Sequence, residues 1–254
     1  MLPSERRARI SDRIRTARIV STDELARSLD VSTETIRRDL LALERHGDVQ
    51  RVHGGAQSAQ LAPVGNEAPF SERVALANSG KVRIGVAAAK LVQPGQTVII
   101  DIGTTALQVA RALPYDFVGV VVTCSLLVAM ELADRPHIEV LVSGGRLRSG
   151  DLALSNSQTT TFFDSIFADV AFLGSGGVDS EAGLTDYYLD EAVTRQSILR
   201  NSRMSFVLAD SSKIGRIARH RVAGLEHLAG LITDVEPSAA ISLALGNGEL
   251  IIAD

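Results

Sequence analysis

The chain has 254 residues, 45% hydrophobic and 22% charged, which is enough for one small and one medium-sized domain with real cores. A formal net charge of −4 excludes binding to nucleic acid through bulk positive charge, so any such binding needs a focused patch. The single cysteine excludes an internal disulfide, and no apolar run approaches the roughly 20 residues of a membrane span. We therefore expect a cytoplasmic protein without a membrane anchor.

The start of the chain carries the pattern of three short helices followed by a β-hairpin. Ile10, Ile14 and Ala17 mark a first helix, because they recur at helical spacing. The run at residues 21–24, Ser-Thr-Asp-Glu, is a capping box that opens a second helix. Ser32 is the expected N-cap of a third helix. Three helices and a hairpin within about 55 residues predict a winged helix-turn-helix.

The third helix has one apolar seam and one cationic surface. Ile36, Leu40 and Leu43 fall at i, i+4 and i+7, so they share one face. Leu41 lies off this seam, and we expect it to pack under the hairpin. Polar and basic side chains occupy the remaining surface of the helix: Glu34, Thr35, Arg37, Arg38 and Arg45.

Positive charge is concentrated in the same part of the chain. Residues 1–56 hold 11 arginines and 9 acidic residues, net +2, whereas the remainder holds 15 basic and 21 acidic residues, net −6. A cationic helix followed by a basic hairpin suits a helix in the DNA major groove with a wing on the backbone. The alternative is a solvated charged face on an ordinary small domain. Short, closely spaced helices and gathered basic residues favour DNA binding.

Eight residues of this region are the expected DNA contacts. Four would read base edges, namely Thr33, Glu34, Thr35 and Arg38. Arg37 and Arg51 would hold phosphates, and His53 would either contact a phosphate or close the hairpin. Ser32, at the start of the helix, completes the set.

The chain divides near residues 57–69, which lack periodicity and contain two prolines and a glycine. We therefore expect a winged helix-turn-helix at 1–56, a linker at 57–69 and an α/β ligand-binding domain at 70–254. Apolar strands alternating with helices predict a mainly parallel sheet covered on both faces. The expected strands are residues 97–100, 118–123, 138–142, 170–173, 205–209, 230–233 and 250–252.

Small, hydroxyl-bearing and charged residues follow successive strands, where open α/β sheets bind ligands. Gly103-Thr104-Thr105 opens an expected helix at 106–113, whose free N–H groups and dipole favour an anion. Lys213 would act as a point charge on a phosphate, while Asp101 and Glu191 suit sugar hydroxyls. The expected ligand-binding residues are Asp101, Gly103, Thr104, Thr105, Cys124, Ser125, Gly144, Gly145, Gly174, Gly176, Glu191 and Lys213.

Each of these turns taken alone is more simply a tight turn, so the pocket is inferred from their repetition at strand ends. Cys124 is either a reactive thiol or, more simply, a small apolar residue. No phosphate-binding Walker A motif and no true Gly-x-Gly-x-x-Gly are present, so no nucleotide is inferred. The five histidines show no metal-ligand spacing.

Two sets of residues resemble the DeoR-type bacterial transcriptional regulators. The first set is Glu34-Thr35-Ile36-Arg37-Arg38-Asp39-Leu40, Leu43-Glu44, Gly47, Arg51 and His53-Gly54-Gly55-Ala56. The second is Phe70-x-x-Arg73, Asn78, Lys81, Asp101-x-Gly103-Thr104-Thr105, Gly144-Gly145-x-Leu147-Arg148, Asp169-x-Ala171-Phe172-Leu173-Gly174 and Asp210-x-Ser212-Lys213. The resemblance implies an effector domain similar in fold to ribose-5-phosphate isomerase that senses a phosphorylated sugar.

The chain departs from the family pattern at two places. Thr123-Cys124-Ser125 stands where the family usually has Thr-Asn-Ser, so a thiol replaces an amide. Residues 152–158 usually contain a glycine, and Ser155-Asn156-Ser157 stands there instead.

We therefore predict a one-component transcriptional regulator, a repressor of a carbohydrate-metabolism operon, that uses no cofactor, metal or catalytic residue. Its partners would be double-stranded operator DNA, a phosphorylated sugar and further copies of the chain in a homodimer or homotetramer. One alternative is an isomerase-like enzyme with an accessory DNA-binding head, in which Asp101 and Lys213 form an acid–base pair. Another is an architectural protein without a ligand. An attached DNA-binding head gives the pocket a sensing purpose, which favours binding over turnover.

Overall fold

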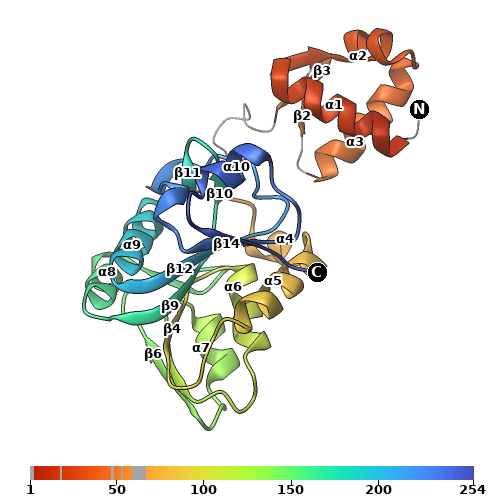
Figure 1. The fold of residues 1–254 in the computed structure, drawn as a ribbon. Helices are drawn as coiled ribbons and strands as arrows, with labels where there is room; N and C mark the ends of the chain where they lie inside the picture. The colour runs from red at the N-terminus through yellow and green to blue at the C-terminus, as the bar shows by residue number, and fades with distance from the viewer. Residues whose placement is uncertain (1–2, 18, 47–48, 53, 59–66) are drawn as a thin grey trace. The chain divides into compact units, whose positions relative to one another are not determined.

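The computed structural model describes residues 3–17, 19–46, 49–52, 54–58 and 67–254 (Figure 1). Contacts within the chain divide it into a small unit, Met1–Gly65, and a large unit, Asn66–Asp254. Each unit is described by itself below.

The small unit contains three helices and a three-stranded antiparallel sheet. The helices are α1 (Pro3–Ala17), α2 (Thr22–Leu29) and α3 (Thr33–His46). The strands lie in the order β1 (Ile19–Ser21), β3 (Gly55–Ser58) and β2 (Val49–Val52). The expected winged helix-turn-helix is therefore confirmed. Strand β1 was not expected, and β3 extends to Ser58, so the first two residues of the expected linker belong to the sheet.

The apolar seam of α3 forms the centre of the small unit's core. Ile36 and Leu40 are completely buried or nearly so, and Leu43 is buried beside them. The placement of Leu41 was wrong, because its side chain is 37% exposed. The space beneath the hairpin is filled instead by its own residues Val49 and Ala56.

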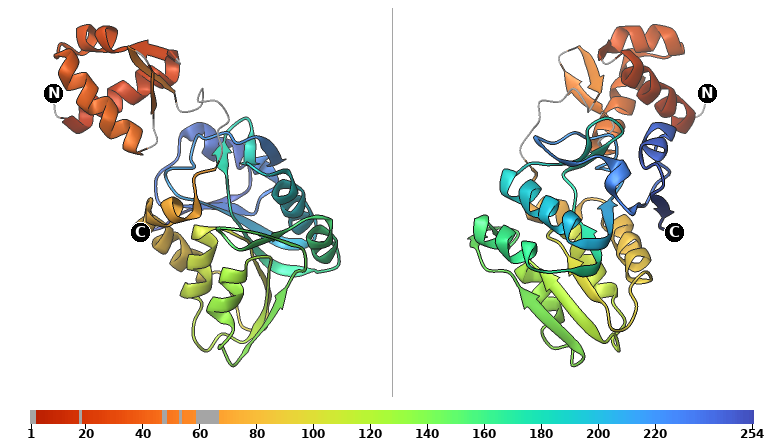
Figure 2. Two further views of the ribbon diagram at one scale, coloured as in Figure 1. Left: turned by 180° about the vertical axis from the view of Figure 1, so that it is seen from behind. Right: turned by 60° about the vertical axis from the view of Figure 1, so that its left-hand side comes forward.

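The large unit is built on a seven-stranded sheet that is parallel throughout (Figures 1 and 2). Its strands lie in the order β15 (Glu249–Ile252), β14 (Gly230–Thr233), β12 (Ser202–Ala209), β9 (Ala168–Leu173), β4 (Thr97–Ile100), β5 (Gly119–Thr123) and β6 (Ile138–Val142). All seven expected strands are present, which confirms the parallel α/β fold.

Helices cover both faces of this sheet (Figure 2). The helices on one face are α5 (Asn78–Ala89), α6 (Thr104–Ala112) and α7 (Leu126–Leu132). Those on the other are α8 (Ser157–Asp164), α9 (Leu189–Arg200) and α10 (Ala239–Ala244), with the short 3-10 helix η2 (Leu225–His227). Successive strand residues alternate between the two cores: Phe172 packs on the first face and Leu173 on the second.

The order of the strands places a topological switch point between β4 and β9. From β4 the chain continues outward through β5 to β6, and it then returns to β9 and continues in the opposite direction. The loops after β4 and β9 therefore leave the sheet in opposite directions and open a crevice at their carboxyl ends.

Two small antiparallel elements were not expected from the sequence. One is a sheet of β10 (Gly177–Asp179), β11 (Gly183–Asp186) and β13 (His220–Ala223). The other is a hairpin of β7 (Arg146–Arg148) and β8 (Ala153–Ser155). With α4 (Phe70–Ala75), they add residues around the carboxyl ends of the central strands. Within the described residues, no helix is long and apolar enough to cross a membrane.

Candidate functional site

Local hydrogen bonds fix the starts of the second and third helices. The Ser32 hydroxyl accepts from the backbone N–H of Thr35 at 3.2 Å, which confirms Ser32 as an N-cap. Ser21 caps α2 in the same way, accepting from the N–H of Glu24 at 3.1 Å. An ion pair of 2.6 Å between Arg6 and the buried Asp39 then ties α1 to α3. The fold thereby holds α3 in place while leaving its outer surface free.

The outer surface of α3 carries the polar and basic residues expected from the sequence. Arg38 is 81% exposed and Arg37 is 64% exposed, and both lie near Glu34, at 3.8 and 3.5 Å. Exposed pairs at this spacing are weak, so both guanidinium groups can exchange Glu34 for another acceptor. Ser32, Thr33, Glu34 and Thr35 gather around the first turn of the helix.

Arg51 on β2 completes the described part of this surface. Its side chain is about half exposed and lies 3.9 Å from Glu44 of α3, and its backbone N–H donates to the same carboxylate. His53 lies outside the described residues, as does the side chain of Arg45. Seven of the eight expected DNA contacts are therefore described, on α3, its N-cap and the adjacent strand.

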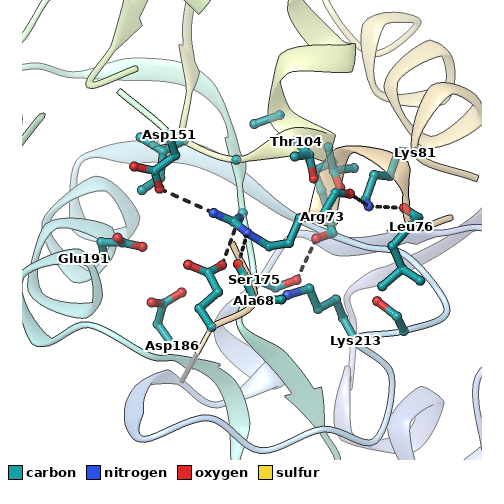
Figure 3. A pocket seen from close by; sticks show the side chains of 18 of the residues that line it. Ala68, Arg73, Leu76, Lys81, Thr104, Asp151, Ser175, Asp186, Glu191 and Lys213 are labelled. Carbon is teal, nitrogen blue, oxygen red and sulfur yellow. Dashed lines mark hydrogen bonds and ion pairs between the residues drawn. The ribbon is translucent and has the colours of Figure 1, made fainter. Parts of the chain in front are cut away.

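The large unit holds a polar pocket at its switch point, where the loops after β4, β9 and β12 meet (Figure 3). Its space amounts to about 680 Å³, including the part open to solvent. Figure 3 shows the carboxylates of Asp151, Asp186 and Glu191 on one side of the pocket and Lys81 and Lys213 on the other. A ligand with hydroxyls at one end and a negative charge at the other would match this polarity.

The amino end of α6 faces the pocket. Gly103 has a φ of 118°, a conformation that glycine adopts readily, and no side chain caps the helix that follows. Thr104 and Thr105 in its first turn line the pocket. The expected helix at 106–113 therefore begins two residues earlier, at Thr104. Free N–H groups at the end of a nine-residue helix favour an anion.

Four pocket cations are satisfied by carboxylates of the chain. Arg73 pairs with Glu67 and Asp151, Lys81 with Asp210, and Arg148 with Asp151 and Glu191. Arg195 pairs with Asp101, Asp186 and Glu191. Lys213 and Arg216 also line the pocket, yet no carboxylate among the described residues forms an ion pair with either. These two cations are therefore available to a negatively charged ligand.

Arg195 forms the buried floor of the pocket. It is 3% exposed, and its Nε donates to Asp101 Oδ2 at 2.6 Å while Nη1 pairs with Asp186. Asp101 also accepts from the N–H of Gly174 at 2.9 Å. A side chain at Gly174 would meet the carbonyl of Ile102 at 2.6 Å, so only glycine allows the loops after β4 and β9 to approach this closely.

Lys81 fixes one wall of the pocket from α5. Its ammonium donates to the carbonyl of Arg73 at 2.6 Å and to that of Leu76, and lies 3.5 Å from Asp210 Oδ2. Burial lowers the pKa of Lys81, although Asp210 opposes this effect. Lys81 thus uses its donors within the protein and holds α4 against the pocket.

Burial shifts the pKa values of two further pocket groups. Desolvation, with the neighbouring Asp186 charge, raises the pKa of Glu191 to about 8, although Arg195 and Arg148 oppose it. Desolvation lowers the pKa of Lys213 to about 8. Both groups therefore change charge just above neutral pH, and perturbed groups of this kind gather at functional sites.

Six of the twelve expected ligand-binding residues line the pocket: Gly103, Thr104, Thr105, Gly174, Glu191 and Lys213. The other six do not. Asp101 is buried beneath it as the partner of Arg195, and the Cys124 thiol lies 3.8 Å from Asp101, within the apolar core. Ser125 caps α7, and Gly176 packs against Asp186 of β11.

Gly144 and Gly145 lie at the start of the β7–β8 hairpin, outside the pocket lining. The carbonyl of Gly144 accepts from the Thr159 hydroxyl at 2.7 Å, and Gly145 has a φ of 135°. These glycines and Cys124 follow β6 and β5, on the side of β4 away from the switch point. Their distance from the pocket follows from strand order.

Several pocket residues carried no signal when each was read alone in the sequence. They are Glu67, Asp151, Asp186, Arg195 and Arg216. Arg73, Lys81 and Arg148 stood only within the motifs of the family resemblance, whereas Ser175 and Ser212 stood in the polar runs that follow two strands but were given no role. A usable signal did exist in α9, where Glu191 and Arg195 are spaced i,i+4 and form an ion pair on one face.

Both units match family models. A model of the DeoR-like helix-turn-helix domain matches residues 6–61, and a model of the DeoR C terminal sensor domain matches residues 77–235. The chain belongs to the DeoR family of transcriptional regulators. The small unit is accordingly its DNA-binding unit and the large unit its sensor domain.

Curated relatives of this DeoR-family regulator align over nearly its whole length. It is 33% identical to the HTH-type transcriptional regulator GolR of Listeria innocua, over 95% of this chain and 94% of that protein. It is 36% identical to GlpR of Haloferax volcanii, over 92% and 91%. It is 32% identical to the glycerol-3-phosphate regulon repressor of Escherichia coli K12, over 96% of each chain. These relatives are regulators and not enzymes, so the isomerase-like alternative is not supported.

The regulator also matches solved structures at low sequence identity. Ribose 5-phosphate isomerase A from Methanocaldococcus jannaschii is 19% identical over 52% of each chain, with a TM-score of 0.39. The full-length sorbitol operon regulator SorC from Klebsiella pneumoniae is 15% identical over 89% of this chain and 94% of that one, with a TM-score of 0.43.

Proposed function

We propose that the protein is a repressor of a carbohydrate-metabolism operon and that a phosphorylated sugar controls its affinity for operator DNA. This proposal rests on which cations of the pocket form ion pairs with carboxylates of the chain and which do not. Lys213 and Arg216 lack a carboxylate partner among the described residues, and they share the pocket with the uncapped start of α6. A phosphoryl group supplies the negative charge and the acceptor oxygens that these donors lack.

The opposite side of the pocket suits the sugar. Asp151, Asp186 and Glu191 present carboxylates, which accept hydrogen bonds from hydroxyl groups (Figure 3). The names of relatives agree with this chemistry, because one is a glycerol-3-phosphate regulon repressor, and glycerol-3-phosphate is a phosphorylated polyol. Another is named a putative aga operon transcriptional repressor.

Contact with DNA would follow the exposed surface of the DNA-binding unit. Thr33, Glu34, Thr35 and Arg38 would read base edges from the first turns of α3, and Arg37 and Arg51 would hold phosphates. Two DNA-binding units in a homodimer or homotetramer would read repeated half-sites. Light scattering of the purified protein gives the number of copies. A protein that is a monomer both free and when bound to operator DNA would contradict this part of the proposal.

A screen of ligands tests the sensor function. The full-length protein is heated with a panel of pentose, hexose and polyol phosphates and with the matching unphosphorylated compounds. We expect one phosphorylated compound to raise the unfolding temperature and its unphosphorylated counterpart to leave it unchanged. Lys213→Ala should abolish the shift while DNA affinity without ligand stays as in wild type. Stabilisation by the unphosphorylated compound alone would overturn the proposal.

A further inference from the structure

The wall of the pocket includes the chain segment that leads from the DNA-binding unit into the sensor domain. Glu67, Ala68 and Arg73 line the pocket, and Glu67 lies nine positions after Ser58, the last residue of β3. The segment that begins at Glu67 is thus both part of the pocket wall and the first described part of the sensor domain.

Glu67 is fastened to the pocket through Arg73. Its Oε1 lies 2.9 Å from Arg73 Nη1, and both side chains are only 12% exposed. Arg73 also lies 3.4 Å from Asp151 and donates from Nε to the carbonyl of Ala68 at 3.0 Å. Figure 3 shows the Arg73 side chain reaching across the middle of the pocket toward Asp151. A pair this well shielded from water is worth more than an exposed one.

The carboxylate of Glu67 also acts on Lys213. Burial lowers the pKa of Lys213, and the largest opposing effect is the negative charge of Glu67. The negative charge of Glu67 therefore acts on Lys213, although the two groups form no direct ion pair among the described residues. Burial and the charge of Asp186 raise the pKa of Glu191, and repulsion from Glu67 adds to this effect.

A phosphoryl group bound by Lys213 and Arg216 would enter the field of this carboxylate. Among the side chains that line the pocket, six carry a basic group (Arg73, Lys81, Arg148, Arg195, Lys213 and Arg216) and four carry a carboxyl group (Glu67, Asp151, Asp186 and Glu191). Two anions that share a site with little water repel each other strongly. Asp186 and Glu191 are fixed by Arg195, whereas Glu67 has Arg73 as its one ion-pair partner among the described residues.

We propose that Glu67 is a built-in opponent of the effector: its carboxylate, paired with Arg73, lines the same pocket as the anion subsite and is displaced from that pair when the phosphoryl group binds. This inference rests on the proposed function, since it assigns the phosphoryl group to Lys213 and Arg216. Displacement breaks the ion pair between Glu67 and Arg73. Arg73 then keeps its ion pair with Asp151 and can also pair with the incoming anion. The segment ahead of α4 then loses its hold on the pocket, so ligand binding and the path to the DNA-binding unit are coupled.

The test compares three full-length proteins: wild type, Glu67→Gln and Glu72→Gln. Glu72 is the matched control, because it is an exposed glutamate on α4 that does not line the pocket, and its change removes the same charge. Isothermal titration calorimetry with inorganic phosphate gives the affinity of each protein. We expect Glu67→Gln to bind phosphate roughly five- to tenfold more tightly than wild type, and Glu72→Gln to bind like wild type.

Hydrogen exchange of the peptide over residues 67–75 gives a second readout. In wild type, saturating phosphate should accelerate exchange in this peptide, and in Glu67→Gln exchange should already be fast without phosphate. If Glu67→Gln binds phosphate as wild type does or more weakly, or if phosphate slows this exchange, the inference is overturned while the proposed function stands. If neither inorganic phosphate nor any sugar phosphate binds wild type or Glu67→Gln, both the inference and the proposed function are overturned.

Discussion

The arginines on the outer surface of α3 and those of the sensor-domain pocket differ in exposure and in the number of partners they hold. Arg38 on α3 is 81% exposed and has one loose neighbour, Glu34. Arg195 in the pocket is 3% exposed and pairs with three carboxylates. A surface residue of the first kind contributes to binding with little effect on folding, whereas one of the second kind is part of the fold.

The largest expected effect follows from removing the floor of the pocket. Arg195→Ala leaves Asp101, Asp186 and Glu191 buried without their shared partner, which should cost the sensor domain about 3–5 kcal/mol. Urea unfolding followed by circular dichroism measures the loss. Arg200→Ala is the control on the same helix, because Arg200 is 60% exposed and its one ion pair with a described residue is with Asp164 at the surface. Equal midpoints for the two variants would show that the floor is not structural.

The DNA-binding unit offers a matched pair for its own core. Leu40→Ala should destabilise it by about 2–5 kcal/mol, because Leu40 is buried at the centre of its apolar cluster. The neighbouring Leu41→Ala should cost less than about 1 kcal/mol, because Leu41 is 37% exposed. Thermal unfolding of both variants makes the comparison. Comparable losses would mean that Leu41 packs against something beyond this unit.

Arg38→Ala should separate DNA recognition from stability. We expect it to lose about 1–3 kcal/mol of discrimination between operator and random DNA, as for a lost base contact, with no change in unfolding temperature. Fluorescence anisotropy with an operator selected from random sequences measures the affinities. Arg9→Ala is the control, since Arg9 is similarly exposed on α1. An Arg38 variant that still prefers the selected operator as wild type does would remove this residue from base readout.

The last expected effect needs no substitution and concerns the pH dependence of anion binding by the pocket. Lys213 has its pKa lowered to about 8, so it loses positive charge as the pH rises through this value. Glu191 has its pKa raised to about 8, so it gains negative charge over the same window. Both changes disfavour an anion above about pH 8, by up to about tenfold per pH unit for each proton involved. Calorimetric titration with phosphate should therefore show weaker binding at about pH 9 than at about pH 8, a range in which phosphate is already mostly the dianion. A constant affinity would exclude both groups from the anion site.

The sequence predicts those features of the molecule that depend on local patterns. The seam of α3, the Ser21 and Ser32 caps and the seven parallel strands follow from patterns that span a few residues, and all are present. The short strands of the β7–β8 hairpin and of the small sheet of β10, β11 and β13 were not predicted, because segments of three or four residues carry too little periodicity.

The sequence predicted where the pocket lies but only some of the residues that line it. Gly103, Thr104 and Lys213 were expected because they follow strands, and strand ends meet at one edge of the sheet. Arg195 was missed because a charged residue on a helix is usually solvated, and its partner Asp101 lies 94 positions away in the sequence. Cys124 was expected at the pocket but is buried in the core beneath it, since β5 lies beyond β4 from the switch point.

The chain's only cysteine provides a natural reporter of events in the sensor domain. Cys124 is buried beside Asp101, and burial raises the pKa of its thiol well above the usual range, so it should react slowly with alkylating reagents while the fold is closed. A change in its labelling rate would time the opening of the protein interior without any engineered probe. The same thiol gives a single attachment point for a dye or spin label in a protein that has no tryptophan.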